Sequence, residues 1–355
     1  MKIIDLTCQK RPVKLKRPFK TALRHVTEID VVDVHIQLED GLAGLGSASS
    51  TWQITGESLE GIVAAVKGPI RGALLNKSIF HLRKISEGVE KSCAANTSAK
   101  AAVDIALHDA YCKAYGIPLY GFLGGKTNSL ETDMTVSIDE PEIMYEAAQK
   151  RVAEGFNVLK IKVGNDQKLD LRRIEKVRSA VGDDVLLRLD ANQGWSGKQA
   201  VEIIHLLERE KMGIELVEQP VPVDDLEGLK FVRERVSTPV MADESVFSPR
   251  DAFRLVKNGA VDLLNIKLMK CGGVRRAWQI ADMCEAAGVQ CMIGSMMESI
   301  VSVTAASHLA AAHPNITYYD LDAPLWMADE KMKGGMRFEG NAVELPDVPG
   351  IGFYN

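Results

Sequence analysis

The sequence predicts an α/β fold in which a (β/α)7β barrel of the TIM type follows an α+β capping domain. Two observations indicate the barrel. Beyond about Glu131, short apolar runs typical of strands alternate with helical segments, and five of these runs end on a charged residue at intervals of 24 to 28 residues. Eight strands with seven intervening helices favour a closed parallel barrel. An open doubly wound sheet is the alternative, but no glycine-rich dinucleotide motif follows the first strand.

Residues 1–125 form the predicted capping domain. Strand-like runs precede helical ones here, an order typical of α+β domains. The pair Gly124-Gly125 permits a chain reversal, so the boundary is placed there. The predicted strands are Ile3–Cys8 and Val31–Leu38, and the segments of helical periodicity are Leu59–Leu75, Ile79–Val89 and Ser98–Tyr115.

Residues 126–325 form the predicted barrel. Its strands are Asp133–Ile138, Val158–Val163, Val185–Asp190, Ile214–Gln219, Val240–Glu244, Leu263–Leu268, Cys291–Ser295 and Tyr318–Asp322. Its helices are Glu142–Glu154, Lys168–Val181, Gly197–Leu207, Asp225–Arg235, Arg250–Asn258, Val274–Ala287 and Ile300–Ala312. The rest of the chain is rich in Gly and Pro, so residues 326–355 are expected to leave the barrel and pack back on the capping domain.

Composition excludes several classes of protein. The 355 residues fit two domains, and 46% hydrophobic with 26% charged residues is ordinary for a soluble protein. A net charge of -5 argues against a nucleic-acid partner. Six cysteines without a C-x-x-C pair indicate reduced thiols, and no run resembles a signal peptide or a membrane span. We expect a cytoplasmic homo-oligomer that acts on a small molecule.

Charged residues at the strand ends are the candidate functional groups, because active sites of such barrels lie at that rim. A single charge there more often caps a helix or meets solvent. Asp190, Glu218 and Asp243, however, come from three successive strands and would supply the oxygen ligands that Mg²⁺ prefers. Without a cation, three converging carboxylates would repel one another. Strand alternation predicts that only one of Asp243 and Glu244 points into the site.

Three lysines accompany these acids. Lys160 and Lys162 are two positions apart on one strand and share a face, so a second cation and a bound Mg²⁺ would lower the pKa of the first amine. The alternative is a solvated basic pair on a surface strand. Lys267 lies four strands further on, on the opposite wall of an eight-stranded barrel. Two amines would then flank one substrate carbon.

Five motifs at these strand ends are Lys160-Ile161-Lys162, Asp190-Ala191-Asn192-Gln193, Glu218-Gln219-Pro220, Ala242-Asp243-Glu244-Ser245 and Asn265-Ile266-Lys267. Together they resemble the enolase superfamily, in its muconate-lactonizing-enzyme subgroup, over nearly the whole chain. The resemblance implies one Mg²⁺ held by the three acids, with Lys162 and Lys267 as acid/base residues. It also implies removal of a proton next to a carboxylate to give an enolate. Mandelate-racemase-like relatives use a histidine where this chain has Lys267, which disfavours that subgroup.

Specificity is expected to come from Asp320-Leu321-Asp322 on the last strand. Two acids at positions i and i+2 would face the same way and bind an ammonium group. The motif resembles that of the dipeptide epimerases of the subgroup, where it holds the α-ammonium of the substrate. The alternative is a helix-capping or turn acid pair before Pro324.

Further substrate contacts are expected from two loops and two strand ends. Thr21-Ala22-Leu23-Arg24 resembles the mobile loop of L-Ala-D/L-Glu epimerases, in which the arginine meets an acidic side chain; a solvated arginine is the alternative. Residues 51–56 would form the other lid loop. Thr135 lies on the first barrel strand, and Ser295 and Met297 lie just beyond the seventh, where the family has substrate contacts. Met297 serves equally well as packing.

The resemblance thus implies a Mg²⁺-dependent epimerase acting at the α-carbon of the C-terminal residue of a dipeptide. Lys160 would help to bind the substrate carboxylate. L-Ala-D/L-Glu is the favoured substrate, which would connect the enzyme with peptidoglycan peptide turnover. An o-succinylbenzoate synthase or a muconate cycloisomerase is the first alternative, and it would not need Asp320 and Asp322. A non-catalytic barrel that binds a metal-carboxylate ligand is the second, and it would have no use for opposed lysines.

Overall fold

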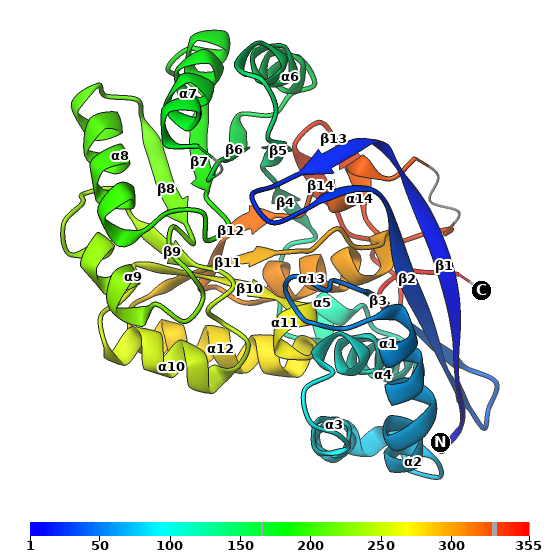
Figure 1. Cartoon of the computed structure of the whole chain (residues 1–355). Coiled ribbons are helices and arrows are strands. Elements are labelled where there is room, and N and C mark those ends of the chain that lie inside the picture. The colour runs from blue at the N-terminus through cyan, green and yellow to red at the C-terminus, as the bar shows by residue number, and fades with distance from the viewer. Residues whose placement is uncertain (165, 329–331, 355) are drawn as a thin grey trace.

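The computed structural model describes residues 1–164, 166–328 and 332–354. Figure 1 shows a barrel of parallel strands surrounded by helices, with an N-terminal antiparallel sheet and its helices packed against one side. The predicted (β/α)7β barrel with an α+β capping domain is confirmed.

The N-terminal part is a three-stranded antiparallel sheet in the order β1-β2-β3, covered by helices. Its strands are β1 (Ile3–Lys20), β2 (His25–Leu38) and β3 (Ala43–Ser49). Its helices are α1 (Leu59–Ala65), η1 (Val66–Ile70), α2 (Arg71–Leu74), η2 (Ile79–His81), α3 (Leu82–Lys91), α4 (Thr97–Tyr115) and α5 (Leu119–Phe122). The first two strands are longer than predicted, and β3 was not predicted. Gly44 and Gly46 weaken the strand signal of β3, but a Cβ at either position would collide with the backbone of α4.

The barrel strands follow one another around a parallel sheet from β5 to β12. They are β5 (Met134–Val136), β6 (Val158–Lys162), β7 (Leu186–Asp190), β8 (Ile214–Glu218), β9 (Val240–Ala242), β10 (Leu263–Lys267), β11 (Gln290–Gly294) and β12 (Ile316–Asp320). The helices are α6 (Pro141–Ala153), α7 (Gln167–Val181), α8 (Gly197–Arg209), α9 (Leu226–Arg233), α10 (Pro249–Lys257), α11 (Leu268–Cys271), α12 (Val274–Ala286) and α13 (Ile300–Ala312). Asp133 N donates to Tyr319 O at 3.2 Å where the first and last strands meet.

Strand register brings the charged strand ends to one level. Lys162 pairs with Asp190, and Asp190 with Glu218, across β6, β7 and β8. On the other side of the barrel, Lys267 pairs with Gly294, which pairs with Asp320. The charged side chains therefore gather at one end of the barrel. Beneath them, a separate apolar cluster of Leu216, Met241, Leu263 and Met292 packs against Tyr318.

Two predictions about strand faces were wrong because the strands end early. Strand β9 stops at Ala242, so Asp243 and Glu244 both follow the strand, and alternation does not separate them. Strand β12 stops at Asp320, whereas Asp322 caps the N-terminus of α14 (Ala323–Trp326) with helical backbone angles. Asp320 and Asp322 are thus not successive residues of one strand face.

The last part of the chain forms β13 (Arg337–Glu339) and β14 (Ala342–Glu344), which extend a small sheet with β4 (Ser129–Glu131). It then contacts the N-terminal helices, since Ile351 N donates to Asp109 Oδ1 at 2.8 Å and Leu119 N donates to Gly350 O at 2.9 Å. The division of the chain at residues 125 and 325 stays a prediction. Within the described ranges, no helix is both long and apolar enough to cross a membrane.

Candidate active site

Three buried carboxylates converge at the mouth of the barrel. Asp190 and Glu218 end β7 and β8, and Asp243 follows β9; each side chain is at most 2% exposed. One oxygen atom from each of the three lies within 4.8 Å of the others. Glu218 Oε2 accepts no hydrogen bond and lies 2.6 Å from Lys160 Nζ. Converging, underpartnered carboxylate oxygens of this kind fit a hard divalent cation such as Mg²⁺.

Each of these acids is also held from behind through one oxygen. The three contacts are Asn192 N to Asp190 Oδ1 at 2.9 Å, Asn265 Nδ2 to Glu218 Oε1 at 2.8 Å, and Lys270 Nζ to Asp243 Oδ1 at 2.5 Å. The second oxygen of each acid is thereby turned toward the centre of the site, where the lysines lie.

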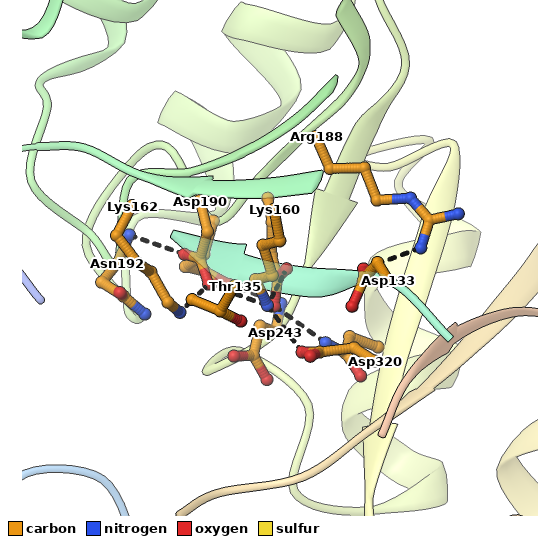
Figure 2. A network of polar contacts seen from close by, with 12 residues as sticks. Asp133, Thr135, Lys160, Lys162, Arg188, Asp190, Asn192, Asp243 and Asp320 are labelled. Atoms are coloured by element: carbon orange, nitrogen blue, oxygen red, sulfur yellow. Dashed lines mark hydrogen bonds and ion pairs between the residues drawn. The ribbon is translucent and has the colours of Figure 1, made fainter. Parts of the chain in front are cut away.

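The predicted lysines lie beside the acids, and Figure 2 shows Lys160 and Lys162 next to Asp190. Lys160 Nζ lies 2.6 Å from Glu218, 2.8 Å from Asp320 and 3.0 Å from Asp190. The other two lysines come from opposite walls of the barrel. Lys162 Nζ is 2.5 Å from Asp190 Oδ2, and Lys267 Nζ is 2.7 Å from Asp243 Oδ2.

The carboxylates, not the lysine pair, dominate the electrostatics. Burial lowers the pKa of Lys160, but attraction to Asp320 and the neighbouring acids outweighs it and raises that pKa well above its usual value. The pKa of Lys267 is also raised, because Asp243 outweighs its burial. The lowered amine pKa expected for the lysine pair includes the charge of a bound Mg²⁺, so it stays a prediction.

The acids differ from one another in the same field. Burial acts to raise the pKa of Asp190, but Lys162 and Lys160 lower it to about 2. Burial, followed by repulsion from Asp190, raises the pKa of Glu218 to about 7. One carboxylate that readily takes a proton next to one that remains charged is typical of functional sites.

Asp320 and Asp322 both line the pocket, although different elements hold them. Asp320 pairs with Lys160, which outweighs burial and lowers the pKa of Asp320. Asp322 Oδ2 accepts hydrogen bonds from Thr135 N at 2.8 Å and from Trp326 Nε1 at 3.0 Å. Burial raises the pKa of Asp322. Thr135 lies on β5, as predicted.

The pocket above these groups has an empty volume of about 530 Å³. The tip of the β1–β2 hairpin covers it and contributes Arg24 to its wall, together with Thr21 and Leu23. Ile54 lines it from the predicted second lid loop, and Ser295 and Met297 line it from the segment after β11. The predicted substrate contacts are thus brought together around one pocket.

Arg24 keeps its charge in this setting. Burial lowers the pKa of its guanidinium to about 10, while the acids Glu244 and Glu298 act to raise it. At neutral pH the pocket therefore presents a cation at the hairpin tip, opposite the acids at the strand ends.

Several site residues were not predicted. Phe19 lines the pocket, and its ring packs edge-on against Trp326 with ring centroids 5.0 Å apart. An aromatic residue just before the predicted loop was the signal that could have found it. Glu244 lines the pocket beside Asp243, where alternation predicted only one of the two. Lys270, fully buried against Asp243, gave no sequence signal, because a lysine in a helical turn is usually solvated.

A second buried ion pair lies next to the site (Figure 2). Arg188 reaches Asp133 at 2.8 Å and Glu215 at 2.5 Å. Burial, followed by repulsion from Asp320, raises the pKa of Asp133 well above its usual range. This pair does not line the pocket, so it serves to fill the barrel with paired charge.

Comparison with known proteins covers the whole chain. Residues 3–124 match the profile described as the N-terminal domain of mandelate racemase / muconate lactonizing enzyme, and residues 143–354 match the enolase C-terminal domain-like profile. The L-Ala-D/L-Glu epimerase of Bacillus subtilis is 47% identical over 353 residues, which is 99% of this chain and 96% of that protein. A hydrophobic dipeptide epimerase of Enterococcus faecalis is 44% identical over 99% of both chains.

Solved structures agree with these sequence matches. A substrate-liganded complex of the Bacillus subtilis L-Ala-D/L-Glu epimerase superposes with a TM-score of 0.99 at 46% identity and covers 100% of this chain and 99% of its own. A dipeptide epimerase from Enterococcus faecalis, complexed with Mg and the dipeptide L-Leu-L-Tyr, superposes with a TM-score of 0.97 at 44% identity over 100% of both chains.

Proposed function

The chain belongs to the mandelate racemase / muconate lactonizing enzyme family of the enolase superfamily, and from this premise we propose that it is a Mg²⁺-dependent dipeptide epimerase. The observation that carries the proposal is the pair Lys162 and Lys267, which line one pocket from opposite walls of the barrel beside three converging acids. Two opposed amines suit a reaction that moves a proton from one face of a carbon to the other.

Asp190, Glu218 and Asp243 would hold the metal, which when bound supplies the positive charge that stabilises a carboxylate as the neighbouring carbon loses its proton. Lys160 would neutralise the same substrate carboxylate. One of Lys162 and Lys267 takes the α-proton as a neutral amine, and the other, as an ammonium group, returns a proton to the opposite face. No net proton is gained or lost, so the same arrangement serves both directions.

The substrate is proposed to be a dipeptide with a free amino terminus. Asp320 and Asp322 would bind its ammonium group through charge-assisted hydrogen bonds. Relatives of 47% and 44% identity are both named as epimerases of dipeptides. A cycloisomerase or synthase acting on a substrate without an amine would have no use for two buried acids on that side of the pocket. The expectation of a cytoplasmic homo-oligomer stays a prediction.

Arg24 favours an acidic C-terminal residue, and L-Ala-D/L-Glu is the proposed substrate. A planar guanidinium in the wall of this pocket suits bidentate binding of a side-chain carboxylate. A hydrophobic dipeptide is the second candidate, because Phe19, Leu23 and Ile54 line the same pocket. The 44% identical Enterococcus faecalis protein is named for that activity.

The test is incubation with Mg²⁺ in D₂O of matched dipeptides, with deuterium gain followed by mass spectrometry. We expect exchange into L-Ala-L-Glu and L-Ala-D-Glu to exceed that into L-Ala-L-Gln, which differs only in the charge of the side chain. Faster exchange into L-Leu-L-Tyr would favour the hydrophobic candidate. Exchange into no dipeptide, together with turnover of a succinylbenzoate precursor, would contradict the epimerase proposal.

A further inference from the structure

Lys270 is a fully buried lysine outside the pocket, and it forms hydrogen bonds to Asp243, one of the proposed metal ligands. It lies in α11, three residues after Lys267, and its side chain has no exposure to solvent. Its ammonium group donates to Asp243 Oδ1 at 2.5 Å, to the backbone oxygen of Asp243, and to Asn265 O at 3.0 Å. An ammonium group has three donors, and all three are used.

These contacts fix the orientation of the Asp243 carboxylate. Oδ1 is held by Lys270, so only Oδ2 faces Lys267 and the other acids. The corresponding oxygens of Asp190 and Glu218 are held by a backbone amide and by the amide of Asn265, which are neutral. A charge-assisted hydrogen bond is roughly twice as strong as a neutral one. Asp243 is therefore the most firmly oriented of the three acids.

The orientation of a carboxylate matters for the choice of ion. Mg²⁺ requires a near-octahedral set of single oxygen ligands, whereas Ca²⁺ accepts six to eight ligands and often binds both oxygens of one carboxylate. A carboxylate whose second oxygen is held by a buried ammonium group cannot chelate an ion with both oxygens. Resting on the metal centre of the proposed function, we propose that Lys270 is a positioning residue that limits Asp243 to one-oxygen ligation and so makes this centre favour Mg²⁺ over Ca²⁺.

A purely structural role for Lys270 makes a different prediction. The turn that follows α11 packs against α4 of the N-terminal part, where Gly273 faces Asp104 and Gly272 faces Lys100. A lysine that only anchored this contact would, when replaced, lower stability and weaken the binding of both ions by the same factor. The ratio of the two affinities distinguishes the roles, because it changes only if the ligand geometry changes.

The experiment compares the wild-type protein with Lys270→Met, which keeps a side chain that reaches Cε and removes the ammonium group with its charge and donors. Dissociation constants for MgCl₂ and CaCl₂ are measured by isothermal titration calorimetry without substrate. We expect the Mg²⁺ constant to rise by about 10- to 100-fold, as for other partners of metal ligands. The Ca²⁺ constant should change far less, because Oδ1 becomes free to bind. The Ca²⁺/Mg²⁺ ratio of constants therefore falls by about tenfold or more.

The matched control is Lys113→Met. Lys113 also pairs with a buried acid, Asp109, at 2.7 Å, but both residues lie in α4 of the N-terminal part. This variant should lose stability, measured as a lower Tm, while both dissociation constants and kcat stay at the wild-type values. An unchanged ratio of constants in Lys270→Met would overturn the role of Lys270.

Two further outcomes are separable. If Lys270→Met does not fold, Lys270→Gln takes its place. The side chain of Gln ends one bond earlier than that of Lys and cannot reach Asp243 Oδ1 in the same way, so this variant must show the same fall in the ratio of constants. An unchanged ratio again overturns the proposal. If the wild-type protein binds neither ion, the metal centre itself is wrong, and the proposed function fails at that point. If the wild type binds Mg²⁺ and Lys270→Met leaves the ratio of constants unchanged, only the proposed role of Lys270 is contradicted.

Discussion

Two pockets in the described part of the chain differ in size, and the smaller one holds the proposed reactive groups. The larger, with an empty volume of about 1630 Å³, lies between α3, α4 and α12 and is lined mainly by apolar and aromatic side chains, including Phe80, Tyr111 and Trp278. The pocket at the barrel mouth has about 530 Å³ and is lined by acids, lysines and Arg24. Size therefore does not identify the site in this protein. The convergence of buried carboxylates and lysines from separate strands does.

The difference follows from how each hollow is built. The larger pocket is a groove between helices, and the charges at its edge are paired with one another. Arg275, for example, lies 3.1 Å from Glu87 and from Glu90. The barrel mouth is formed by strand ends in register, and register forces charges from separate strands to one level. Charged side chains at the edge of a groove between helices can turn toward solvent, whereas those at the rim of a barrel cannot.

The largest expected effect is at the opposed lysines. Replacing Lys162 or Lys267 by Ala removes a proton-transfer group and should lower kcat for epimerisation by about 10²- to 10⁴-fold. Each variant should still exchange the α-proton of one epimer with D₂O through the remaining amine, which mass spectrometry of the separate epimers detects. Lys84→Ala, an exposed lysine at the groove, is the control and should change nothing. Full activity of Lys162→Ala or Lys267→Ala would contradict the assignment of the reaction to the pocket at the barrel mouth.

The next effect concerns the acids proposed to bind the substrate amine. Asp320→Asn keeps the shape of the side chain but removes its charge, so kcat/KM for a free dipeptide should fall by about 10- to 100-fold, the value of a charge-assisted hydrogen bond. The same peptide with an acetylated amino terminus has no charge for Asp320 to bind. Its slow reaction should therefore be equal in the variant and the wild type, and an equal loss with both peptides would contradict the assignment.

A third prediction concerns the acid sensitivity of folding at a buried histidine of α13. His308 is fully buried beside α5, and its ring stacks on Tyr120 with centroids 5.7 Å apart. Burial lowers the pKa of His308 to about 3. Between pH 6.5 and 3 the unfolded chain binds a proton that the folded chain does not, so stability falls as pH falls through this window.

From pH 7 to pH 5 this single group should remove on the order of 2 kcal/mol from the free energy of unfolding. His308→Gln should remove that part of the pH dependence, measured by urea unfolding at both pH values. His205→Gln, at an exposed histidine, is the control. If both variants kept the wild-type change in the free energy of unfolding between pH 7 and pH 5, the acid sensitivity would have to come from the barrel mouth instead.

The smallest effect is expected in the groove itself. Phe80 lines the groove and is 41% exposed. Phe80→Ala removes an aromatic ring there without changing a charged group of the pocket at the barrel mouth. We expect kcat/KM for the dipeptide to stay within about twofold of the wild-type value, as for most surface substitutions. A loss comparable with that of Asp320→Asn would show that the larger hollow takes part in the reaction.

Much of this architecture could be predicted because strand ends leave a clear signal. Strands β6, β7, β8 and β10 end within one residue of their predicted ends, and Lys162, Asp190, Glu218 and Lys267 close them. Apolar residues followed by an abrupt charge report both the end of a buried strand and the rim of the barrel. Local pattern and position in the fold coincide at these residues.

The failures come from contacts that local pattern does not encode. The glycines of β3 resemble a loop because their purpose is close approach to α4, which lies far away in the sequence. Lys270 resembles a solvated helix residue because its partner, Asp243, is reached only across the interior.

The hydrogen bonds to Asp322 have a consequence for how such an enzyme acquires new substrates. This carboxylate binds the backbone amide of Thr135 on the first barrel strand and the indole of Trp326 just after the last, so it fastens the seam where the barrel closes. A mutation at Asp322 would therefore alter specificity and foldedness together. Asp320 also has a structural contact, since it pairs with the buried Lys160, whereas Arg24 lies at the tip of the β1–β2 hairpin. Natural or laboratory evolution toward other substrates should therefore reach Arg24 first and leave Asp322 until compensating stability has accumulated.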